Sequence, residues 1–269
     1  MESSISISLS DGGRRHQFPS DTPSSEAGWI PSRSSISPMI PVPNDIPRAI
    51  DPSNLPGGKR SLSGISLRSF LLGLVLGVST SLTIFLWWSS NSLWRASFFL
   101  ASLSLFHFLE FYVTACYNPR KASISAFLLT QNGAAYNIAH GSAMTECILA
   151  RILLPPGYFK WTAIIFAGSR WQVGLGLALM VVGQIARTLA MVQAGTNFSH
   201  TMQRERKDGH ILVKDGIYSI LRHPSYFGFF WWGLGTQVVL GNVFCFLGYA
   251  LVLWKFFSTR IQSKPDSRD

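Results

Sequence analysis

Long apolar runs alternate with polar segments along most of this chain, and these runs predict helices that cross a membrane. A bilayer core about 30 Å thick needs roughly 20 apolar residues of helix, because each residue adds about 1.5 Å. The final run breaks at Gly241-Asn242 into halves of about 16 residues, which favours a tight helical hairpin over two independent spans. The runs expected to form helices are residues 69–88, 95–115, 123–154, 161–192 and 226–257.

The predicted fold class is therefore an all-α polytopic membrane protein with about six membrane helices, including a C-terminal helical hairpin and a cytosolic cofactor-binding loop region. The first 60 residues differ from the rest, because they are rich in Ser and hold nine of the fourteen prolines. Such a segment cannot bury enough apolar surface to offset its ordering entropy. The expected domains are a disordered cytosolic tail (1–60), membrane helices 1–4 (61–193), a catalytic region (194–260) and a short polar C-terminus (261–269).

The charged residues add to this prediction the orientation of the helices in the membrane. Charged residues make up 13% of the chain, and the net charge is +10. Lys and Arg collect in cytosolic loops beside anionic lipid, so basic residues around the first two helices place those ends in the cytosol. No basic-aromatic patch lies outside the membrane runs, and we expect no nucleic-acid partner. The orienting residues are Lys59, Arg60, Arg68, Arg120 and Lys121.

A few polar or small residues inside the apolar runs are candidates for function. His107 and Glu110 lie three residues apart on one helix face, and ionisable groups at membrane depth commonly mark functional sites. The alternative is that Glu110 is solvated or paired near a helix end. His140 could line a cavity, with a hydrogen-bonded packing role as the alternative. Gly73 and Gly77 form a Gly-x-x-x-Gly pair that would let a second copy of the chain pack closely, or another helix of the same chain.

The segment between the fourth and fifth runs is the longest polar stretch flanked by apolar runs. A connection of about 30 residues is usually functional or disordered. This one carries enough apolar residues to pack, and a folded juxtamembrane linker is the plain alternative. Its distinctive motifs are NFSH (197–200), Gln203, HILV (210–213), DGIY (215–218) and RHPSYFG (222–228).

In this order the motifs resemble the isoprenylcysteine carboxyl methyltransferase family, and the resemblance runs from about Phe106 to Arg260. An Arg-His-Pro-x-Tyr element alone is shared with a wider superfamily of membrane methyltransferases and sterol reductases. The resemblance implies transfer of a methyl group from S-adenosyl-L-methionine to the C-terminal carboxylate of a prenylated cysteine in CaaX-processed proteins. Small GTPases and other lipidated peptides would be the substrates. The enzyme would be a multi-pass protein of the endoplasmic reticulum membrane, with N-terminus and active site cytosolic.

The resemblance also implies a set of site residues. Arg260 would bind the substrate carboxylate, a task that suits a guanidinium. An α-carboxylate is already ionised at neutral pH, so neither a general base nor a metal ion is required. The residues implied to line the S-adenosylmethionine pocket are Gln203, His210, Ile211, Leu212, Val213, Tyr218, His223, Pro224, Ser225 and Tyr226.

After Arg260 the sequence departs from the family's pattern. Family members continue with a run of glutamates, one of which contacts the cofactor four positions on, whereas Lys264 stands there in this chain. Pro265 would end the helix. We therefore expect this chain to keep the fold and most of the pocket but to methylate its substrate poorly or not at all. The alternatives are a phospholipid or other small-molecule methyltransferase of the same superfamily, which would not need Arg260 in this role, and an inactive membrane scaffold.

Overall fold

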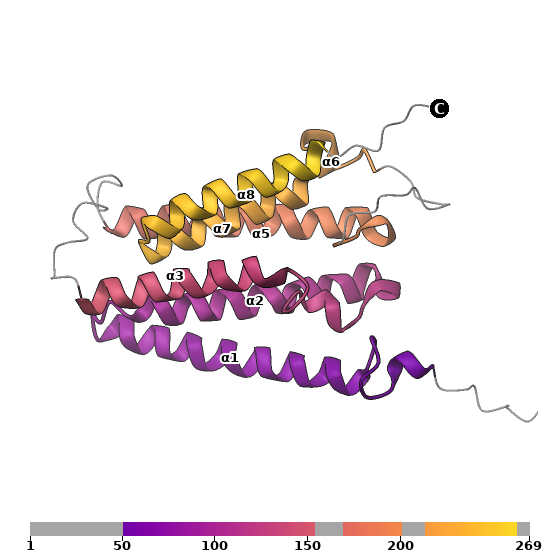
Figure 1. Cartoon of the computed structure of the whole chain (residues 1–269), viewed down its shortest axis with the longest axis horizontal. Coiled ribbons are helices and arrows are strands. Elements are labelled where there is room, and N and C mark those ends of the chain that lie inside the picture. The colour runs from indigo at the N-terminus through magenta and orange to yellow at the C-terminus, as the bar shows by residue number, and fades with distance from the viewer. Residues whose placement is uncertain (1–50, 154–168, 201–212, 263–269) are drawn as a thin grey trace, which may run out of the picture. The chain divides into compact units, whose positions relative to one another are not determined.

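The computed structural model describes residues 51–153, 169–200 and 213–262, without the side chains of 260–262. All of them belong to one unit, Ala49–Asp269. Within these ranges the secondary structure is entirely helical, as predicted (Figure 1). Short 3-10 turns cover Pro52–Asn54, Pro119–Lys121, Ile124–Phe127 and Gly195–Asn197. The α-helices are α1 (Leu62–Trp88), α2 (Trp94–Tyr117), α3 (Gly133–Leu153), α5 (Ser169–Ala194), α6 (Ile217–Ile220), α7 (Pro224–Leu240) and α8 (Phe244–Gln262).

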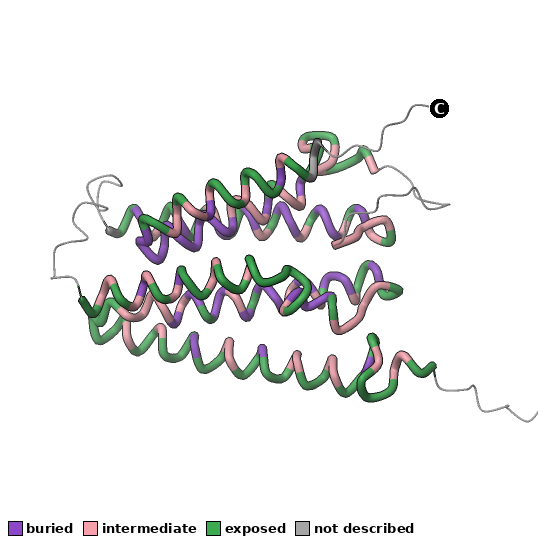
Figure 2. The backbone as a smooth tube through the Cα atoms, in the orientation of Figure 1, coloured by how far each residue is buried: buried purple, intermediate pink, exposed green. Residues whose placement is uncertain are grey.

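Three stretches in the described part are long and apolar enough to cross a membrane: Leu62–Trp88, Trp94–Tyr117 and Arg170–Asn197. Phe244–Thr259 is a shorter apolar helix. Figure 2 shows α1 as exposed segments alternating with intermediate ones, and only Leu72 and Ser79 of this helix are buried. An apolar helix that is so exposed within the protein is suited to face lipid. The total of six membrane helices stays a prediction.

Two predicted helix boundaries differ from the structure. The first helix begins at Leu62 rather than at residue 69, because the Ser61 hydroxyl accepts a hydrogen bond from the Gly64 amide (3.2 Å) and caps an earlier start. The third helix was predicted from residue 123, which is wrong. A 3-10 turn occupies Ile124–Phe127, and Leu128 adopts a left-handed conformation (φ 57°) that interrupts any helix, so α3 starts at Gly133.

Helices α5 and α7 approach each other through glycines. A Cβ atom at Gly183 would lie 2.6 Å from the Gly228 carbonyl oxygen, and one at Gly228 would lie 2.5 Å from that of Gly183. Gly176, seven residues before Gly183 on α5, and Gly235, seven residues after Gly228 on α7, form a second close contact of the same kind. Small residues let helix backbones pack closely in a membrane. These contacts fix the register of α7 on α5 and therefore the position of the first turn of α7.

The break predicted at Gly241-Asn242 is confirmed. Gly241 ends α7 in the left-handed conformation (φ 72°), which glycine adopts without strain. Carbonyls at a helix end need other partners, and inside a membrane these must come from protein. Side chains from α2, α3 and α5 donate to the last carbonyls of α7, and the Glu146 carboxylate accepts from three amides at the start of α8. The donors are Arg95 to Val239 (2.7 Å), Arg151 to Leu240 (2.6 Å) and Gln172 to Val238 (2.9 Å).

Candidate active site at the start of α7

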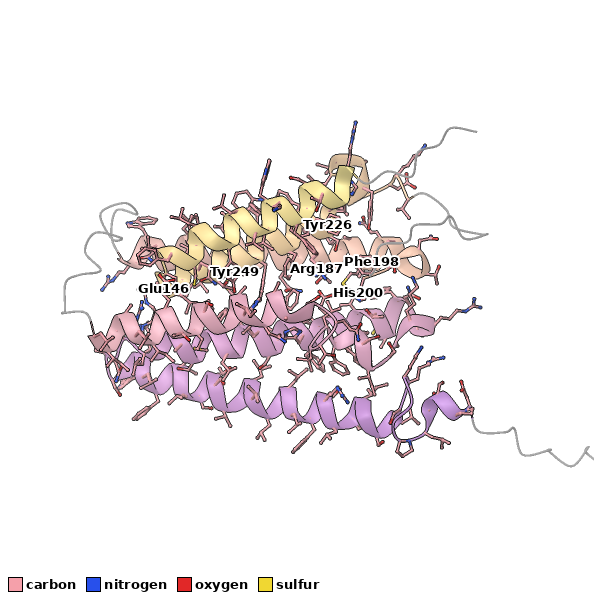
Figure 3. All side chains as sticks on the ribbon, in the orientation of Figure 1. Glu146, Arg187, Phe198, His200, Tyr226 and Tyr249 are labelled. Carbon is pink, nitrogen blue, oxygen red and sulfur yellow. The ribbon has the colours of Figure 1, made fainter. Side chains whose placement is uncertain are left out.

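The polar stretch is described in two parts, residues 194–200 and 213–226. Three of the described cofactor residues, Pro224, Ser225 and Tyr226, form the first turn of α7. Figure 3 shows Tyr226, Arg187 and His200 toward one end of the helices and Glu146 toward the other. Four predicted cofactor residues lie outside the described residues, and so does the side chain of Arg260. Those four are Gln203, His210, Ile211 and Leu212.

A buried ion pair lies beneath this turn. Arg187 on α5 donates through Nε and Nη2 to the two carboxylate oxygens of Glu110 on α2, with 2.9 Å for the Nη2 bond. Counting backbone and side chain together, Arg187 is 7% exposed and Glu110 is 1% exposed. The guanidinium also lies over the rings of Phe106 and Phe229, 5.5 and 5.3 Å from their centroids. A bidentate pair stacked on aromatic rings holds both side chains in fixed positions.

The third nitrogen of Arg187 connects this pair to the predicted cofactor residues. Nη1 donates to the Ser225 hydroxyl (3.0 Å) and to the Ser225 carbonyl oxygen (3.3 Å). Because Arg187 donates to the Ser225 oxygen, the hydroxyl hydrogen of Ser225 points elsewhere and can donate to another acceptor. The ion pair therefore orients Ser225 from below.

His200, the last residue of the NFSH motif, packs against the same carboxylate. Its Nδ1 lies 3.5 Å from Glu110 Oε2, and its Nε2 lies 3.2 Å from the Thr114 hydroxyl. Thr114 donates its hydrogen to the Glu110 carbonyl (2.7 Å), so Nε2 is the donor to Thr114. Burial lowers the pKa of His200 to about 4, although the Glu110 charge opposes this shift. The ring is therefore neutral at pH 7, and Arg187 alone balances Glu110 within this group.

Aromatic rings cover the outer side of the turn. Tyr226 stacks between His223 (5.7 Å between centroids) and Phe257 of α8 (4.8 Å). Burial, with a smaller contribution from Arg222, lowers the pKa of His223. Tyr218 donates its hydroxyl to the Ala190 carbonyl of α5 (3.0 Å), so this hydroxyl already has an acceptor.

The match to known proteins is extensive. Residues 176–266 match the family described as the isoprenylcysteine carboxyl methyltransferase (ICMT) family. The protein-S-isoprenylcysteine O-methyltransferase of Saccharomyces cerevisiae is 42% identical over 204 residues, which cover 76% of this chain and 82% of that protein. The chain belongs to the isoprenylcysteine carboxyl methyltransferase family. The predicted family is confirmed, and so is the predicted enzyme class.

Other family members match over a smaller share of their length. The Homo sapiens enzyme of the same name is 38% identical over 204 residues, which cover 76% of this chain and 66% of that protein. A solved structure of "the eukaryotic intramembrane Ras methyltransferase ICMT" superposes with a TM-score of 0.62 at 31% identity, covering 74% of this chain and 66% of that one. This likeness supports a multi-pass membrane protein of the ICMT family.

Of the other candidates, Glu110 is paired with Arg187 beside the start of α7, as one of the two alternatives had it, and His107 and His140 lie outside this pair. His107 binds the Phe127 carbonyl (2.8 Å) and the Tyr136 hydroxyl (3.1 Å) instead of the ion pair. His140 binds the Tyr136 carbonyl (2.9 Å) and stacks on Phe99, which agrees with a packing role. Within the described ranges, no three His, Cys, Asp or Glu side chains gather as a metal site would require.

Arg187 is the site residue that its sequence position alone did not reveal. Arg187 lies within the apolar run 161–192, with apolar residues on both sides. A signal was present, because one acidic and one basic residue buried in two apolar helices usually pair with each other. Gly73 and Gly77 have nothing within 4 Å of a Cβ atom in the described part of the chain, so neither packs against another of its helices. Self-association through these glycines stays a prediction.

Proposed function

We propose that this chain transfers the methyl group of S-adenosyl-L-methionine to the free C-terminal carboxylate of prenylated cysteine in CaaX-processed proteins. Small GTPases and other lipidated peptides would be its substrates, and the endoplasmic reticulum membrane its location. The observation that carries the proposal is the first turn of α7. Three residues assigned to the cofactor by family resemblance lie there, and a buried ion pair holds the central one, Ser225.

The residues of this turn fit S-adenosylmethionine. In the described part of the chain no side chain caps the start of α7, where Pro224 occupies the first position. The Tyr226 and Phe227 amides both donate to the His223 carbonyl (3.1 Å each), so the Ser225 amide is the helix-start donor that would face a ligand. A helix start of this kind suits the carboxylate of the methionine moiety. The stack of His223, Tyr226 and Phe257 offers aromatic faces to an adenine ring or to a sulfonium. His223 is neutral at pH 7 because its pKa is lowered, so it would not repel the cation.

Bound S-adenosylmethionine supplies an electrophilic methyl group on a sulfonium, and the protein's task is alignment and exclusion of water. The acceptor carboxylate is an ionised nucleophile at pH 7, so no residue needs to remove a proton. Ser225 and Tyr226 would hold the cofactor, with Gln203, the HILV residues 210–213 and Tyr218 completing its pocket. Arg260, on the last turn of α8, would bind the acceptor carboxylate.

The structure supports placing the tail and the site on one side of the membrane. Arg60, before α1, donates to the Pro119 carbonyl at the end of α2 (3.2 Å). Lys121 donates to the Phe198 carbonyl beyond α5 (2.9 Å). The start of α1 and the ends of α2 and α5 thus share one end of the bundle, which is the cytosolic end by its Lys and Arg content. Six membrane spans and the domain boundaries 1–60, 61–193, 194–260 and 261–269 remain parts of this proposal. Lys264 and Pro265, on which the expected loss of activity depends, lie outside the described ranges.

Membranes that contain the chain should be incubated with methyl-labelled S-adenosylmethionine and either a farnesylated cysteine derivative or a phospholipid extract. The proposal predicts label in the farnesylated acceptor and none in phospholipid above membranes without the chain. Label in phospholipid alone would assign the chain to the alternative methyltransferase class, and label in neither acceptor would favour the scaffold alternative.

A further inference from the structure

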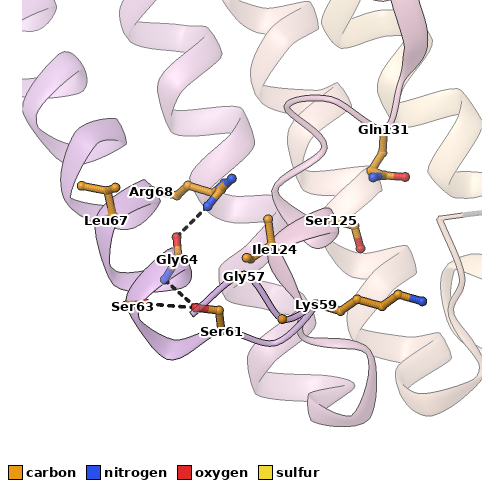
Figure 4. Close-up of a pocket in the computed structure, with 11 residues that line it drawn as sticks. Gly57, Lys59, Ser61, Ser63, Gly64, Leu67, Arg68, Ile124, Ser125 and Gln131 are labelled. Carbon is orange, nitrogen blue, oxygen red and sulfur yellow. Dashed lines mark hydrogen bonds between the residues drawn. The ribbon is translucent and has the colours of Figure 1, made fainter. Parts of the chain in front are cut away.

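A second cavity lies away from the methyl-transfer site, between the start of α1 and the segment that follows α2 (Figure 4). Its volume is about 710 Å³, within the usual range for ligand pockets. Two hydrogen bonds link the start of α1 to the segment after α2: the Ile124 amide donates to the Lys59 carbonyl (3.0 Å), and the Arg60 guanidinium donates to the Pro119 carbonyl (3.2 Å). The cavity is therefore a built feature of the fold.

The chemistry of the lining is that of an anion site. Two cationic side chains line it, Lys59 and Arg68, and no carboxylate does so among the described residues. Arg68 is anchored by a bond from Nη1 to the Gly64 carbonyl (3.0 Å), which keeps its guanidinium at the wall. The polar lining groups besides these are the hydroxyls of Ser61, Ser63 and Ser125 and the amide of Gln131.

The depth of the cavity relative to the membrane follows from the length of α1. Its 27 residues make a helix of about 40 Å, roughly 10 Å more than a bilayer core. Trp87 and Trp88 end the helix and are suited to the opposite interface. About seven residues at the start, Leu62–Arg68, then lie among the headgroups, and the cavity lies with them. Just above, Phe70, Leu71 and Leu74 are 67%, 46% and 52% exposed, as expected of a surface against acyl chains.

We propose that this cavity binds the headgroup of an anionic phospholipid of the cytosolic leaflet. The headgroup phosphate lies against Arg68, and Lys59, whose ammonium points away from Arg68 in Figure 4, adds positive charge at another part of the cavity. The exposed hydroxyls of Ser63 and Ser125 and the Gln131 amide bind polar headgroup atoms, and the acyl chains follow the exposed face of α1. Phosphatidylinositol is a suitable probe, because its ring hydroxyls match the lining hydroxyls.

Native mass spectrometry of the full chain in mild detergent, titrated with phosphatidylinositol, tests this assignment. The variant Lys59→Gln/Arg68→Gln should weaken binding about 30-fold, since each basic residue near a membrane surface contributes about 1 kcal/mol. The matched control Arg120→Gln/Lys255→Gln removes two exposed charges outside the cavity and should change affinity less than about threefold. Lys59→Arg/Arg68→Lys keeps both charges and should retain binding.

Equal affinities for the wild type and Lys59→Gln/Arg68→Gln would overturn the site, as would an equal loss in the control variant. Soluble inositol phosphate provides the second arm, because it carries the headgroup without acyl chains. It should bind much more weakly than the lipid, and equal affinity would overturn the assignment to a lipid. Unchanged binding of S-adenosylmethionine by Lys59→Gln/Arg68→Gln would show that a loss of lipid is not a loss of fold.

Discussion

Replacing Glu110 with glutamine should destabilise the protein strongly. The side chains of Arg187 and Glu110 are 9% and 1% exposed, and the carboxylate accepts two bonds from the guanidinium. Removing one partner of such a buried pair leaves an uncompensated charge and costs about 3–5 kcal/mol. Glutamine keeps the size of the side chain and one acceptor oxygen, so we expect a loss near ~3 kcal/mol.

The free energy of unfolding in mixed micelles measures this loss. Asp215→Asn is the control, because Asp215 is an exposed carboxylate whose neutralisation should change stability by less than ~0.5 kcal/mol. The double variant Glu110→Leu/Arg187→Met should be less destabilised than either single variant, since it leaves no unpaired charge. It should still bind S-adenosylmethionine about tenfold more weakly, because Ser225 has lost its bond from Arg187, which is worth about 1–1.5 kcal/mol. Glu110→Gln unfolding within ~0.5 kcal/mol of wild type would refute the reasoning.

Three further outcomes are expected. Tyr226→Leu should raise the dissociation constant for S-adenosylmethionine about tenfold by removing the ring between His223 and Phe257, whereas Phe227→Leu, outside that stack, should not; equal effects in isothermal titration would contradict this. Gly228→Ala should destabilise by about 1–3 kcal/mol because its Cβ would meet the Gly183 carbonyl, while Gly174→Ala, with open space, should not; equal unfolding energies would speak against the glycine contact. The pKa of His200 is about 4 in the folded protein against 6.5 when unfolded, so its contribution to stability is present above pH 6.5 and is lost as the pH falls toward 4. The variant His200→Asn should therefore flatten the curve of unfolding free energy against pH between these values. An unchanged curve would exclude His200 as the cause of the slope.

Sequence patterns predicted the helices well and their boundaries less well. The break at Gly241-Asn242 followed from glycine chemistry that is local to the chain, and the structure has it there. The start of α3 was predicted too early, because the apolar residues 126–129 suggest a helix, whereas the structure has a 3-10 turn at Ile124–Phe127 that packs on α2. The capping of the α7–α8 turn by Arg95, Arg151 and Glu146 was equally hidden, since it depends on α2 and α3 both reaching that turn.

The site residues also fall into two groups, those that the sequence predicted and those that only the fold brings together. The motif residues Ser225 and Tyr226 were found from the sequence because family resemblance marks short stretches of chain. The partnership of Arg187 with Glu110 joins residues 77 positions apart, and only the fold brings them together. Glu110 was a candidate because a carboxylate at membrane depth is costly, but its partner depended on how α2 packs against α5.

The central claim is that the acceptor is the carboxylate of a prenylated cysteine, and ester chemistry tests it most directly. The purified chain should be incubated with methyl-labelled S-adenosylmethionine and either farnesylated cysteine with a free carboxylate or its C-terminal amide. The account predicts label only on the free acid, released as methanol by mild alkali because it is a methyl ester. Label on the amide, or label on the acid that alkali does not release, would contradict it.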